Sequence, residues 1–436
     1  MSERSGGMKE QAVREVSAGY WIEARAVSAE DVPPGYKRTE VGVIPEDWQA
    51  ERLGLHASFR TGPFGSSLHQ SDYKKNGTPV INPMHIVDGT LRPSSEMSVD
   101  NVICKRLSEF RFRPGEIVIG RRGEIGRCAV IKDIHTGWLC GTGSMIIRPI
   151  DVVPEYLQRV LSSRKAIESI ENSSVGSTMI NLNQGSLSSL VIPLPSNPEQ
   201  HAIATALSDV DELIASLDRL IAKKHAIKQA AMQQLLTGQT RLPGFTGEWQ
   251  TRRLEDVAEI VMGQSPSSFY YNIYGHGLPL IQGNADVHER KTIKRIFTSQ
   301  ITKRGLRGDV LMSVRAPVGE ISRTAFDVCL GRGVCAIRFP NNFMYHFLIH
   351  LEPSWARYSS GSTFDSINSN DVGNMEITLP TCPNEQTAIA TVLSDMDSEI
   401  EALEHRREKT RQIKQGMMQQ LLTGRVRLVA PEEAAA

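Results

Sequence analysis

The sequence predicts an α+β protein made of two similar units, each a mixed α/β domain followed by one long amphipathic helix. Three observations support this fold class. The segment 198–211 is repeated at 384–397, and the segment 232–238 is repeated at 418–424, both with a spacing of 186 residues. The apolar residues in these regions follow a helical period, while the rest of each copy contains short strand-like runs. We therefore expect two domains joined by a pair of long antiparallel coiled-coil helices with pseudo-two-fold symmetry.

The predicted helices carry apolar residues in alternating steps of four and three, which give a period near 3.5 and are typical of a coiled-coil seam. After Ile221 the stripe weakens at Lys224 and resumes at Ile227, Ala231 and Leu235. Each helix spans about 40 residues, or roughly 60 Å. The two copies are nearly identical, which indicates one partner-docking surface present twice. The positions of this spacer and docking seam are Ile203, Leu207, Val210, Ile214, Leu217 and Ile221 in the first copy, and Ile389, Leu393, Met396, Ile400 and Leu403 in the second.

The ends of both helices are marked by proline and glycine. Pro198 and Pro383 lie where the first turn tolerates a missing N–H, and Gly238 and Gly424 lie where a glycine ends a helix. The predicted division of the chain is an N-terminal extension at 1–38, expected to be partly disordered, a first domain at 39–195, a central helix at 196–239, a second domain at 240–380, a distal helix at 381–428 and a disordered tail at 429–436.

Within the domains the two copies share only scattered positions, including the segments 176–178 and 361–363, both Gly-Ser-Thr. Short apolar runs bounded by glycine and proline predict strands and short helices. The expected strands are 116–120, 127–131, 144–148, 309–314 and 334–339, and the expected helices are 154–163 and 342–350. Repeated helices beside divergent domains indicate a common docking surface and two different recognition surfaces.

Composition points to a globular protein without a membrane segment. Apolar residues make up 40% of the chain and charged residues 22%. No apolar run approaches the length of a membrane span, and residues 1–11 lack the apolar core of a secretory signal, so we expect a cytoplasmic protein. The six cysteines never occur as CxxC pairs, so we expect buried free thiols and no metal site.

Catalytic signatures are absent from the sequence. It contains no GxGxxG or P-loop, no nucleophile elbow and no HExxH motif. An adenine methyltransferase would carry an Asn/Asp-Pro-Pro-aromatic loop, and the run from Asn82 to His85 does not supply one. We therefore expect a chain without catalytic residues.

Local charge points to nucleic acid, although Lys+Arg and Asp+Glu both number 49. Seven basic and three acidic residues lie between Lys105 and Arg127, and nine basic and two acidic residues lie between Arg290 and Arg323. Arginine, lysine, asparagine and glutamine read base edges, while hydroxyls and backbone N–H groups bind phosphates. The candidate DNA-binding residues are Lys74, Lys75, Arg121, Arg122, Ser177, Thr178, Gln282, Asn284, Arg315, Ser362 and Thr363. A solvated strand-end arginine or a simple turn explains several of them equally well.

The order of these parts resembles the specificity (S) subunit of type I restriction–modification enzymes. The resemblance is carried by the run Tyr-Lys-Arg-Thr-Glu-Val-Gly-Val-Ile-Pro-Glu-Asp-Trp at 36–48, the two Gly-Ser-Thr segments, the Pro-Leu-Pro and Thr-Leu-Pro boundaries ending at Pro195 and Pro380, and the two helices that begin with Glu-Gln and end with Gln-Gln-Leu-Leu-Thr-Gly. It covers the chain from Tyr36 to Leu428. Each motif alone is weak, but their ordered duplication is specific.

The resemblance implies two target recognition domains that each read one half of a bipartite double-stranded DNA site. It also implies two methyltransferase (modification) subunits docked on the helices, joined by restriction subunits, with no membrane involved. S-adenosylmethionine, ATP and Mg are then expected in the partner subunits and no cofactor in this chain. Three rivals stay open: the specificity subunit of a type IIB/IIG-like enzyme, a coiled-coil scaffold that binds only protein, and a nuclease with unrecognised carboxylates.

Overall fold

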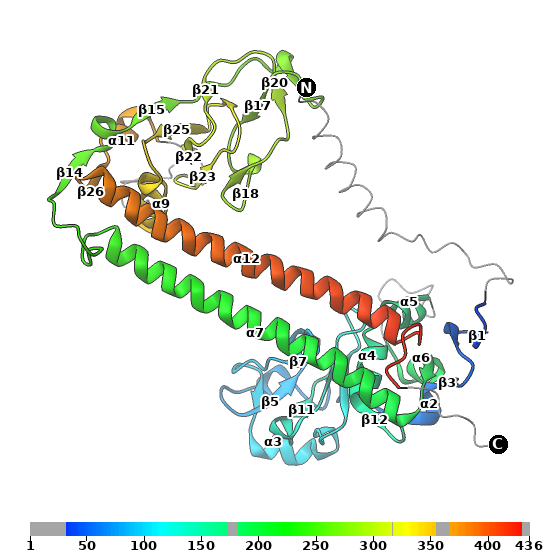
Figure 1. Ribbon diagram of the computed structural model, residues 1–436. Helices are drawn as coiled ribbons and strands as arrows, with labels where there is room; N and C mark the ends of the chain where they lie inside the picture. The colour runs from blue at the N-terminus through cyan, green and yellow to red at the C-terminus, as the bar shows by residue number, and fades with distance from the viewer. Residues whose placement is uncertain (1–31, 173–181, 316, 355–366, 430–436) are drawn as a thin grey trace. The chain divides into compact units, whose positions relative to one another are not determined.

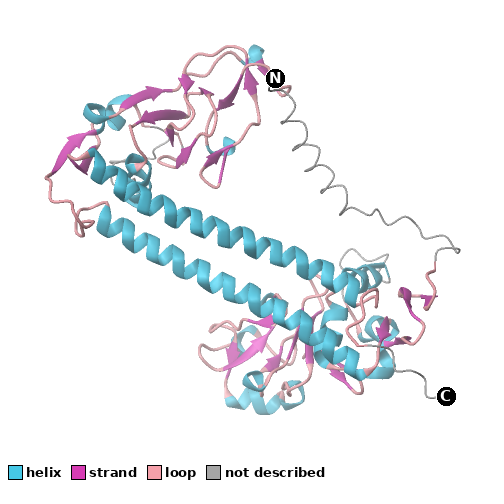
Figure 2. Ribbon diagram, in the orientation of Figure 1, coloured by secondary structure: helices cyan, strands magenta, loops and turns pink. Residues whose placement is uncertain are grey.

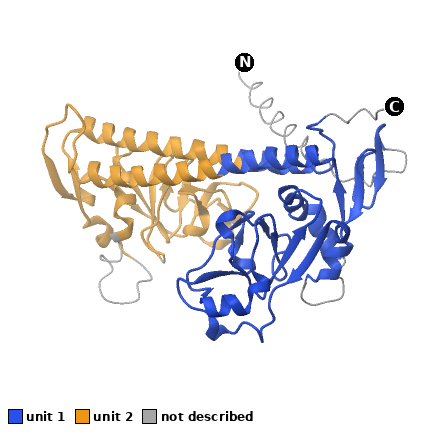
Figure 3. Ribbon diagram, turned by 90° about the horizontal axis from the view of Figure 1, so that it is seen from below, with its two compact units in different colours: residues 1–214, 409–436 blue, residues 215–408 orange. Residues whose placement is uncertain are grey.

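The computed structural model describes residues 32–172, 182–315, 317–354 and 367–429. The chain divides into two compact units: unit 1 is residues 1–214 with 409–436, and unit 2 is residues 215–408 (Figure 3). Both divisions fall inside the long helices, whereas the predicted boundaries were placed at the helix ends. Each unit therefore contains one mixed α/β domain and a part of each long helix.

The domain of unit 1 consists of short strands and helices that precede the first long helix (Figure 1). Its elements are β1 (Tyr36–Thr39), β2 (Gly42–Pro45), β3 (Gln49–Arg52), α2 (Leu53–His56), β4 (Ala57–Thr61), η1 (Gln70–Asp72), β5 (Thr78–Ile81), η2 (Pro83–His85), β6 (Ile86–Val87), β7 (Thr90–Leu91), β8 (Ser98–Val99), α3 (Asn101–Arg106), η3 (Ser108–Phe110), β9 (Ile117–Gly120), β10 (Cys128–Val130), η4 (Asp133–His135), β11 (Leu139–Cys140), β12 (Ser144–Pro149), α4 (Pro154–Leu161), α5 (Arg164–Asn172), α6 (Gln184–Ser189), β13 (Val191–Leu194) and the first part of α7 (Asn197–Leu235).

The central sheet of unit 1 has the strand order β10-β9-β12-β4 and is covered on both faces. Strand β9 is buried along its whole length, and its successive side chains point to opposite faces. Ile117 and Ile119 pack in the cluster that contains Ile203 of α7, whereas Val118 packs in the cluster that contains Ile81 of the smaller sheet β11-β5-β8. Burial on both faces explains why this strand is a continuous apolar run in the sequence.

Unit 2 repeats this arrangement, and in each unit the strands form a body beside the helix segments (Figure 2). Its elements are the second part of α7, β14 (Trp249–Arg253), α8 (Leu254–Val257), β15 (Glu259–Met262), η5 (Ser268–Tyr270), β16 (Tyr271–Asn272), β17 (Leu278–Ile281), η6 (Asn284–Asp286), β18 (Val287–His288), β19 (Lys291–Thr292), β20 (Phe297–Thr298), β21 (Arg304–Gly305), β22 (Val310–Ser313), β23 (Ile321–Arg323), β24 (Val328–Leu330), β25 (Val334–Arg338), α9 (Phe343–Leu351), η7 (Glu352–Ser354), α11 (Ser369–Gly373), β26 (Glu376–Pro380) and most of α12 (Pro383–Leu421).

The core of unit 2 has the same two faces as that of unit 1. In its larger sheet, of order β15-β25-β22-β23-β19-β18, Val310 and Met312 of β22 pack in the cluster that contains Ile389 of α12, whereas Leu311 packs with Ile281 of the smaller sheet. All five strands and both short helices expected from the sequence are present, as β9, β10, β12, β22, β25, α4 and α9. The predicted α+β fold with two similar units is therefore confirmed.

Both long helices, α7 and α12, are 39 residues long, and their segments run antiparallel in each unit. In unit 2, Arg407 Nη1 lies 3.2 Å from Asp218 Oδ1, and Lys228 pairs with Asp397. Ten residues forward along α7 therefore correspond to ten residues backward along α12. In unit 1, Lys414 Nζ lies 2.6 Å from Asp211 Oδ1. This pair occupies the positions of the Lys228–Asp397 pair after a shift of 186 residues, so the helix repeat also repeats its ion pairs.

The predicted seam is buried only in part. Ile203, Leu207, Leu217, Ile221, Ile389, Leu393 and Ile400 are buried, while Val210, Ile214, Met396 and Leu403 are half-buried. The expected resumption of the stripe at Ile227, Ala231 and Leu235 is wrong at Ile227, which is 43% exposed, but Ala231 is half-buried and Leu235 is buried in the core of unit 2. Lys224 and Lys228 pair with Glu399 and Asp397 of the other helix. In this stretch the two helices are therefore held together by ion pairs.

The burial of the seam also corrects its assignment as a docking surface. Ile203 and Leu207 lie in the core of unit 1, and Ile389 and Leu393 lie in the core of unit 2. These four side chains attach the helices to their own domains and leave no surface for a partner. A partner has to use the exposed faces of the helices.

Each long helix ends at a glycine in the left-handed region, as predicted: φ is 71° at Gly238 and 66° at Gly424. Beyond the second glycine, Arg427 returns to the start of α7, where its Nε donates to Glu199 Oε1 at 2.6 Å. Trp48 Nε1 donates to the same carboxylate at 3.0 Å, and the Arg427 guanidinium lies 5.8 Å from the Trp48 ring. The beginning of the first domain and the residues after the last helix are thus joined in unit 1.

Unit 2 contains the counterpart of this cluster. Arg241 Nε donates to Glu385 Oε1 at 2.5 Å, and the Arg241 guanidinium lies 5.9 Å from the Trp249 ring. Here the arginine lies in the linker between α7 and β14, and the tryptophan is the first residue of β14. The same Arg–Glu–Trp cluster therefore anchors the start of each long helix, once through a linker and once through two distant parts of the chain.

The predicted extension at 1–38 includes residues that belong to the fold. Strand β1 begins at Tyr36 and pairs with β2, and the Tyr36 hydroxyl donates to the Gly424 carbonyl at 2.9 Å. The boundary therefore lies before Tyr36, because these residues contact the end of α12. Residues 1–31 and 430–436 lie outside the described residues.

The cysteines are free, and five of the six are buried, in line with the expectation of buried thiols. Burial raises the pKa of Cys128 and of Cys335 to about 12, which keeps both thiols protonated at neutral pH. None of the helices in the described part of the chain is long and apolar enough to cross a membrane.

Candidate DNA interface

Several loops of unit 1 meet at the edge where β4, β5 and β9 end, which we call the loop edge. Gly62 donates its N–H to Ser144 O at 3.0 Å, and Gly141 donates to Ile81 O at 2.9 Å. Asn82 Oδ1 accepts a hydrogen bond from Gly143 N at 3.3 Å. Glycine is required at this crossing, because a Cβ on Gly62 would lie 1.9 Å from the Gly141 carbonyl oxygen.

Unit 2 has the same loop edge, built from the corresponding strands. Gly263 donates its N–H to Val334 O at 3.0 Å, and Gly331 donates to Ile281 O at 2.8 Å. A Cβ on Gly263 would lie 2.0 Å from the Gly331 carbonyl oxygen. The scaffold of the loop edge is therefore duplicated, although few of its side chains are.

The arginines predicted from the repeat lie at these loop edges but have different roles. Arg121 is half-buried, and its Nε donates to the Leu182 carbonyl at 2.9 Å. Burial, together with the neighbouring charge of Arg122, lowers the pKa of Arg121. Arg122 and Arg315, which occupy equivalent positions, are both exposed. Arg121 thus holds the loop edge together, whereas the two exposed arginines remain candidates for a DNA contact.

The predicted residues Ser177, Thr178, Ser362 and Thr363 lie outside the described residues. The first described residue after each Gly-Ser-Thr segment does lie at the loop edge. Leu182 N donates to Arg121 O at 2.9 Å in unit 1, and Ile367 N donates to Val314 O at 3.0 Å in unit 2.

In unit 2 the structure brings Gln282 and Asn284 to the arginine loop. Asn284 Nδ2 lies 3.5 Å from the carbonyl of Pro317, two residues after Arg315. Gln282 Nε2 donates to the Tyr271 hydroxyl at 2.9 Å, and its backbone N–H donates to the Asp286 carboxylate. Gln282 and Asn284 therefore form one polar group at the end of β17, beside the loop that carries Arg315.

Lys74 and Lys75 do not join such a group. They precede β5, at the end opposite to its loop edge, and both are exposed. Lys74 Nζ lies 2.6 Å from Asp100 Oδ2, and Lys75 Nζ lies 2.9 Å from Glu96 Oε1. Because these carboxylates offset their charge, both lysines are weaker candidates for a DNA contact than the exposed Arg122 and Arg315.

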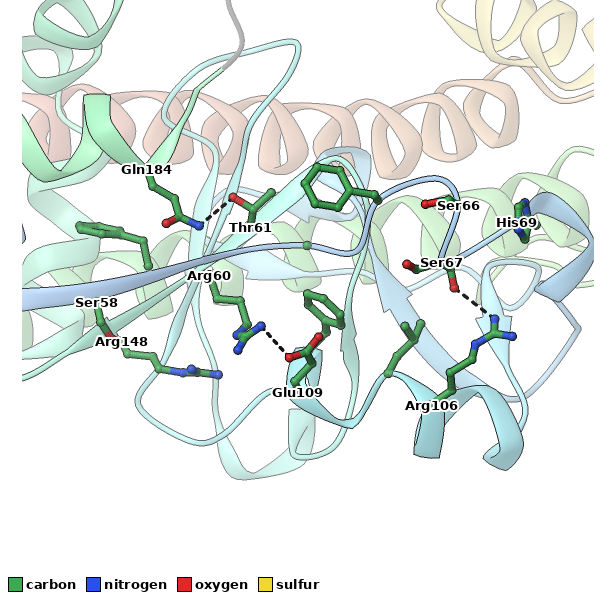
Figure 4. A pocket seen from close by; sticks show the side chains of 15 residues that line it. Ser58, Arg60, Thr61, Ser66, Ser67, His69, Arg106, Glu109, Arg148 and Gln184 are labelled. Atoms are coloured by element: carbon green, nitrogen blue, oxygen red, sulfur yellow. Dashed lines mark hydrogen bonds and ion pairs between the residues drawn. The ribbon is translucent and has the colours of Figure 1, made fainter.

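A cleft of 810 Å³ opens along β4 and the loop that follows it in unit 1 (Figure 4). Arg60 Nη1 lies 2.8 Å from Glu109 Oε2, and Arg106 Nη2 donates to the Ser67 carbonyl at 3.1 Å. Gln184 Nε2 donates to Thr61 Oγ1 at 3.1 Å. Guanidinium, amide and hydroxyl groups are the donors that bind phosphates and base edges.

The sequence interpretation missed this cleft. Its lining residues come from segments more than 100 residues apart, from Ser58 in β4 to Gln184 in α6. One local signal was available: the run Gly-Pro-Phe-Gly-Ser-Ser at 62–67 directly follows a strand, at the place where a Gly-rich loop can present hydroxyls.

Both domains thus contain the same scaffold edge, and comparison with known proteins assigns both domains to one family. The family model described as the type I restriction modification DNA specificity domain matches residues 45–224 and again 246–414. The chain belongs to this family. The two matches coincide with the two copies of the repeat, so the chain holds two specificity domains.

Relatives of this specificity-domain chain extend over nearly its whole length. It is 29% identical to the putative type I restriction enzyme MjaX specificity subunit of Methanocaldococcus jannaschii, over 90% of this chain and 97% of that protein. Among solved structures it resembles the type I restriction–modification S subunit of M. genitalium, with a TM-score of 0.58 and 17% identity over 86% of this chain and 96% of that one. A chain from a type I R-M complex gives a TM-score of 0.57 and 24% identity, covering 88% and 99%. These two likenesses concern the fold.

Proposed function

We propose that the chain is the DNA-specificity subunit of a type I restriction–modification complex. Each specificity domain reads one half of a bipartite double-stranded DNA site, and the helices space the domains and dock two methyltransferase subunits. Restriction subunits join that assembly. The chain itself supplies no catalytic residue, and the S-adenosylmethionine, ATP and Mg chemistry belongs to the partners.

One observation carries this proposal: the loop edge is duplicated as a scaffold but not as a chemical surface. The glycine crossings at Gly62 and Gly263 are equivalent, and so are the exposed Arg122 and Arg315. The adjoining side chains differ, since the segment after β4 contributes Ser66 and Ser67 to a cleft that also contains arginines, whereas the segment after β15 exposes Phe269 and Tyr274. Two domains that hold DNA alike but present different groups would read two different half-sites.

The helices support the docking of two copies of one partner. The segments shared by both helices are 197–211 with 383–397, and 227–238 with 413–424, and each unit contains one copy of each. Five exposed residues of these segments are identical in both units, and we call these the docking faces. They are Thr205, Asp209, Ile413, Gln415 and Gln419 in unit 1, and Thr391, Asp395, Ile227, Gln229 and Gln233 in unit 2.

The decisive experiment is co-expression of the chain with its methyltransferase subunit, followed by genome-wide methylation sequencing. We expect one split motif with two short half-sites and an unread spacer, and no methylation with either subunit alone. Absence of a bipartite motif, with an intact complex, would overturn the proposal. Isolation of this chain with a fused nuclease–methyltransferase would instead assign it to a type II system.

A domain exchange tests whether each specificity domain reads its own half-site independently of the other. Residues 39–195 are replaced by the first domain of a relative that has a different target. We expect one half-site to change and the other to stay, because the second domain is untouched. A change in both half-sites would contradict independent reading. The same exchange assigns each half-site to its unit.

A further inference from the structure

The segment that follows the edge strand differs in composition between the two domains. It leaves β4 in unit 1 and β15 in unit 2, and both copies begin at a glycine of the loop edge, Gly62 or Gly263. In unit 1 this segment lines the cleft of arginines and hydroxyls. In unit 2 it carries a group of exposed apolar side chains instead. The same place in the fold therefore has two chemistries.

The apolar ridge of unit 2 consists of Phe269, Tyr270, Ile273 and Tyr274. Phe269 is 86% exposed, Tyr274 80%, Ile273 73% and Tyr270 42%. Phe269 and Tyr270 are in edge-to-face contact, with ring centroids 5.3 Å apart. Four large apolar side chains within six residues on one exposed loop are typical of a surface that is covered by a partner.

The ridge is held in place by hydrogen bonds. Ser267 N donates to Gln300 Oε1 at 2.9 Å, which fixes the start of the loop. Asn272 Oδ1 accepts from the backbone N–H groups of Tyr274 and His276 at 3.2 and 3.0 Å, and Asn272 Nδ2 donates to His276 O at 2.8 Å. An ordered loop loses less conformational entropy when a ligand covers it.

The ridge is continuous with the polar group at the loop edge. Tyr271 lies between Tyr270 and Asn272, and its hydroxyl accepts the hydrogen bond from Gln282 Nε2 at 2.9 Å. Gln282 lies with Asn284 beside the Arg315 loop. A single surface of unit 2 therefore combines amide groups with the apolar ridge.

Cations flank this surface. Arg332 adjoins the start of the ridge segment, because its backbone N–H donates to Ser265 Oγ at 3.1 Å. Lys303 adjoins it through Leu330: Leu330 N donates to Lys303 O at 2.8 Å, and Leu330 O accepts from Gln264 N at 2.9 Å. Together with Arg315 these side chains are exposed, and none is ion-paired within the described part of the chain. Unpaired cations favour a polyanion over an apolar protein surface as the partner.

We propose that the apolar ridge of unit 2 contacts thymine methyl groups in the major groove of the half-site that this unit reads. In the major groove an A·T pair presents a thymine methyl beside the acceptor and donor groups that asparagine and glutamine recognise. The ridge and the adjoining Gln282 and Asn284 match these two features of one base pair. This inference rests on the proposed function and adds the chemistry of one half-site.

The test replaces thymine by uracil, which lacks only the 5-methyl group. Duplexes carrying the site found by methylation sequencing are bound to the complex of this chain with its methyltransferase subunits. Each thymine of the unit 2 half-site is replaced in turn, and the same replacement in the unit 1 half-site is the control. We expect at least one replacement in the unit 2 half-site to weaken binding about fourfold, the value for one buried methyl group.

The variant Phe269→Ala/Tyr274→Ala completes the test. It should bind the thymine duplex more weakly than wild type and no longer distinguish thymine from uracil in that half-site. The matched control is Leu306→Ala, because Leu306 is 41% exposed and precedes β22, at the end of that strand opposite to the loop edge. This variant should keep the wild-type preference for thymine.

Several outcomes would overturn the inference while leaving the proposed function intact. They are a methylated bipartite site whose unit 2 half-site contains no A·T pair, a wild-type complex that is indifferent to uracil there, and a double variant that keeps the preference. Loss of a methyltransferase subunit from the double variant would also overturn it, because the ridge would then contact protein. Absence of any bipartite methylation would count against the proposed function itself.

Discussion

Arg427 is the residue through which the end of the second helix holds the start of the first. It donates to Glu199, which is only 1% exposed and also accepts from Trp48. Arg427→Met removes the cation and leaves a buried carboxylate with one partner fewer, so we expect a loss of about 3 kcal/mol of stability. Urea unfolding followed by tryptophan fluorescence measures it, and Arg425→Met is the exposed control. Equal midpoints for the two variants would contradict the role of Arg427.

His56 gives unit 1 a pH-dependent contribution to stability. Burial of the ring disfavours protonation, but hydrogen bonds to Asp151 and Glu51, at 2.8 and 2.9 Å, outweigh it and raise the pKa of His56. A raised pKa in the folded state stabilises the fold below the unfolded value of about 6.5, and this stabilisation is lost as the pH rises through the folded value. We therefore expect His56→Gln to lose more stability at pH 6 than at pH 8.5. Urea midpoints at both pH values check this, and an equal loss at both would refute it.

Among the elements, the two helix ends form a matched pair for measuring the effect of packing. Both Gly238 and Gly424 have a positive φ, so alanine at either position costs about 1 kcal/mol from backbone strain alone. A Cβ on Gly424 would lie 2.4 Å from Pro45 Cγ, whereas one on Gly238 would lie 3.3 Å from the nearest atom of Trp249. We expect Gly424→Ala to be more destabilising by about 1 to 3 kcal/mol, the usual cost of overpacking. Equal urea midpoints for the two variants would contradict this prediction, because they would show that Pro45 at the end of β2 moves aside without an energetic cost.

The docking faces of the helices make a prediction about stoichiometry. Ile413 in unit 1 and Ile227 in unit 2 occupy equivalent positions and are 51% and 43% exposed. If each contacts one methyltransferase subunit, Ile413→Glu or Ile227→Glu alone should convert a complex with two methyltransferases into one with a single copy, and the double variant should lose both. Native mass spectrometry measures the copies. Arg219→Ala, at an exposed position in the part of α7 that is not repeated, should leave two copies bound.

At the scale of the whole molecule, the sequence predicted what depends on local periodicity and on duplication. The helices, the strands such as β9 and the two-unit plan all follow from patterns within a few residues or from the constant spacing of the repeat. The distinction between Arg121 and Arg122 did not, because it depends on a hydrogen bond to Leu182, 61 residues away. The cleft and the charged stretch at Lys224 are likewise set by partners distant in the sequence. The candidate residues for contacts to bases are therefore harder to predict from the sequence than the scaffold that carries them.

The spacer helices lead to a prediction about the target as a whole. Insertion of seven residues after 214 in α7 and after 410 in α12 keeps the apolar phase and the ion-pair register, because seven residues complete one heptad. Each helix then lengthens by about 10 Å. At 3.4 Å per base pair, the unread spacer of the methylated motif should grow by up to about three base pairs, with both half-sites unchanged. Methylation sequencing measures the spacer.

A three-residue insertion at both places is the control, because it rotates the seam away from its partner and should lower stability. An active seven-residue variant with the original spacer length would show that the helices do not set the distance between the half-sites.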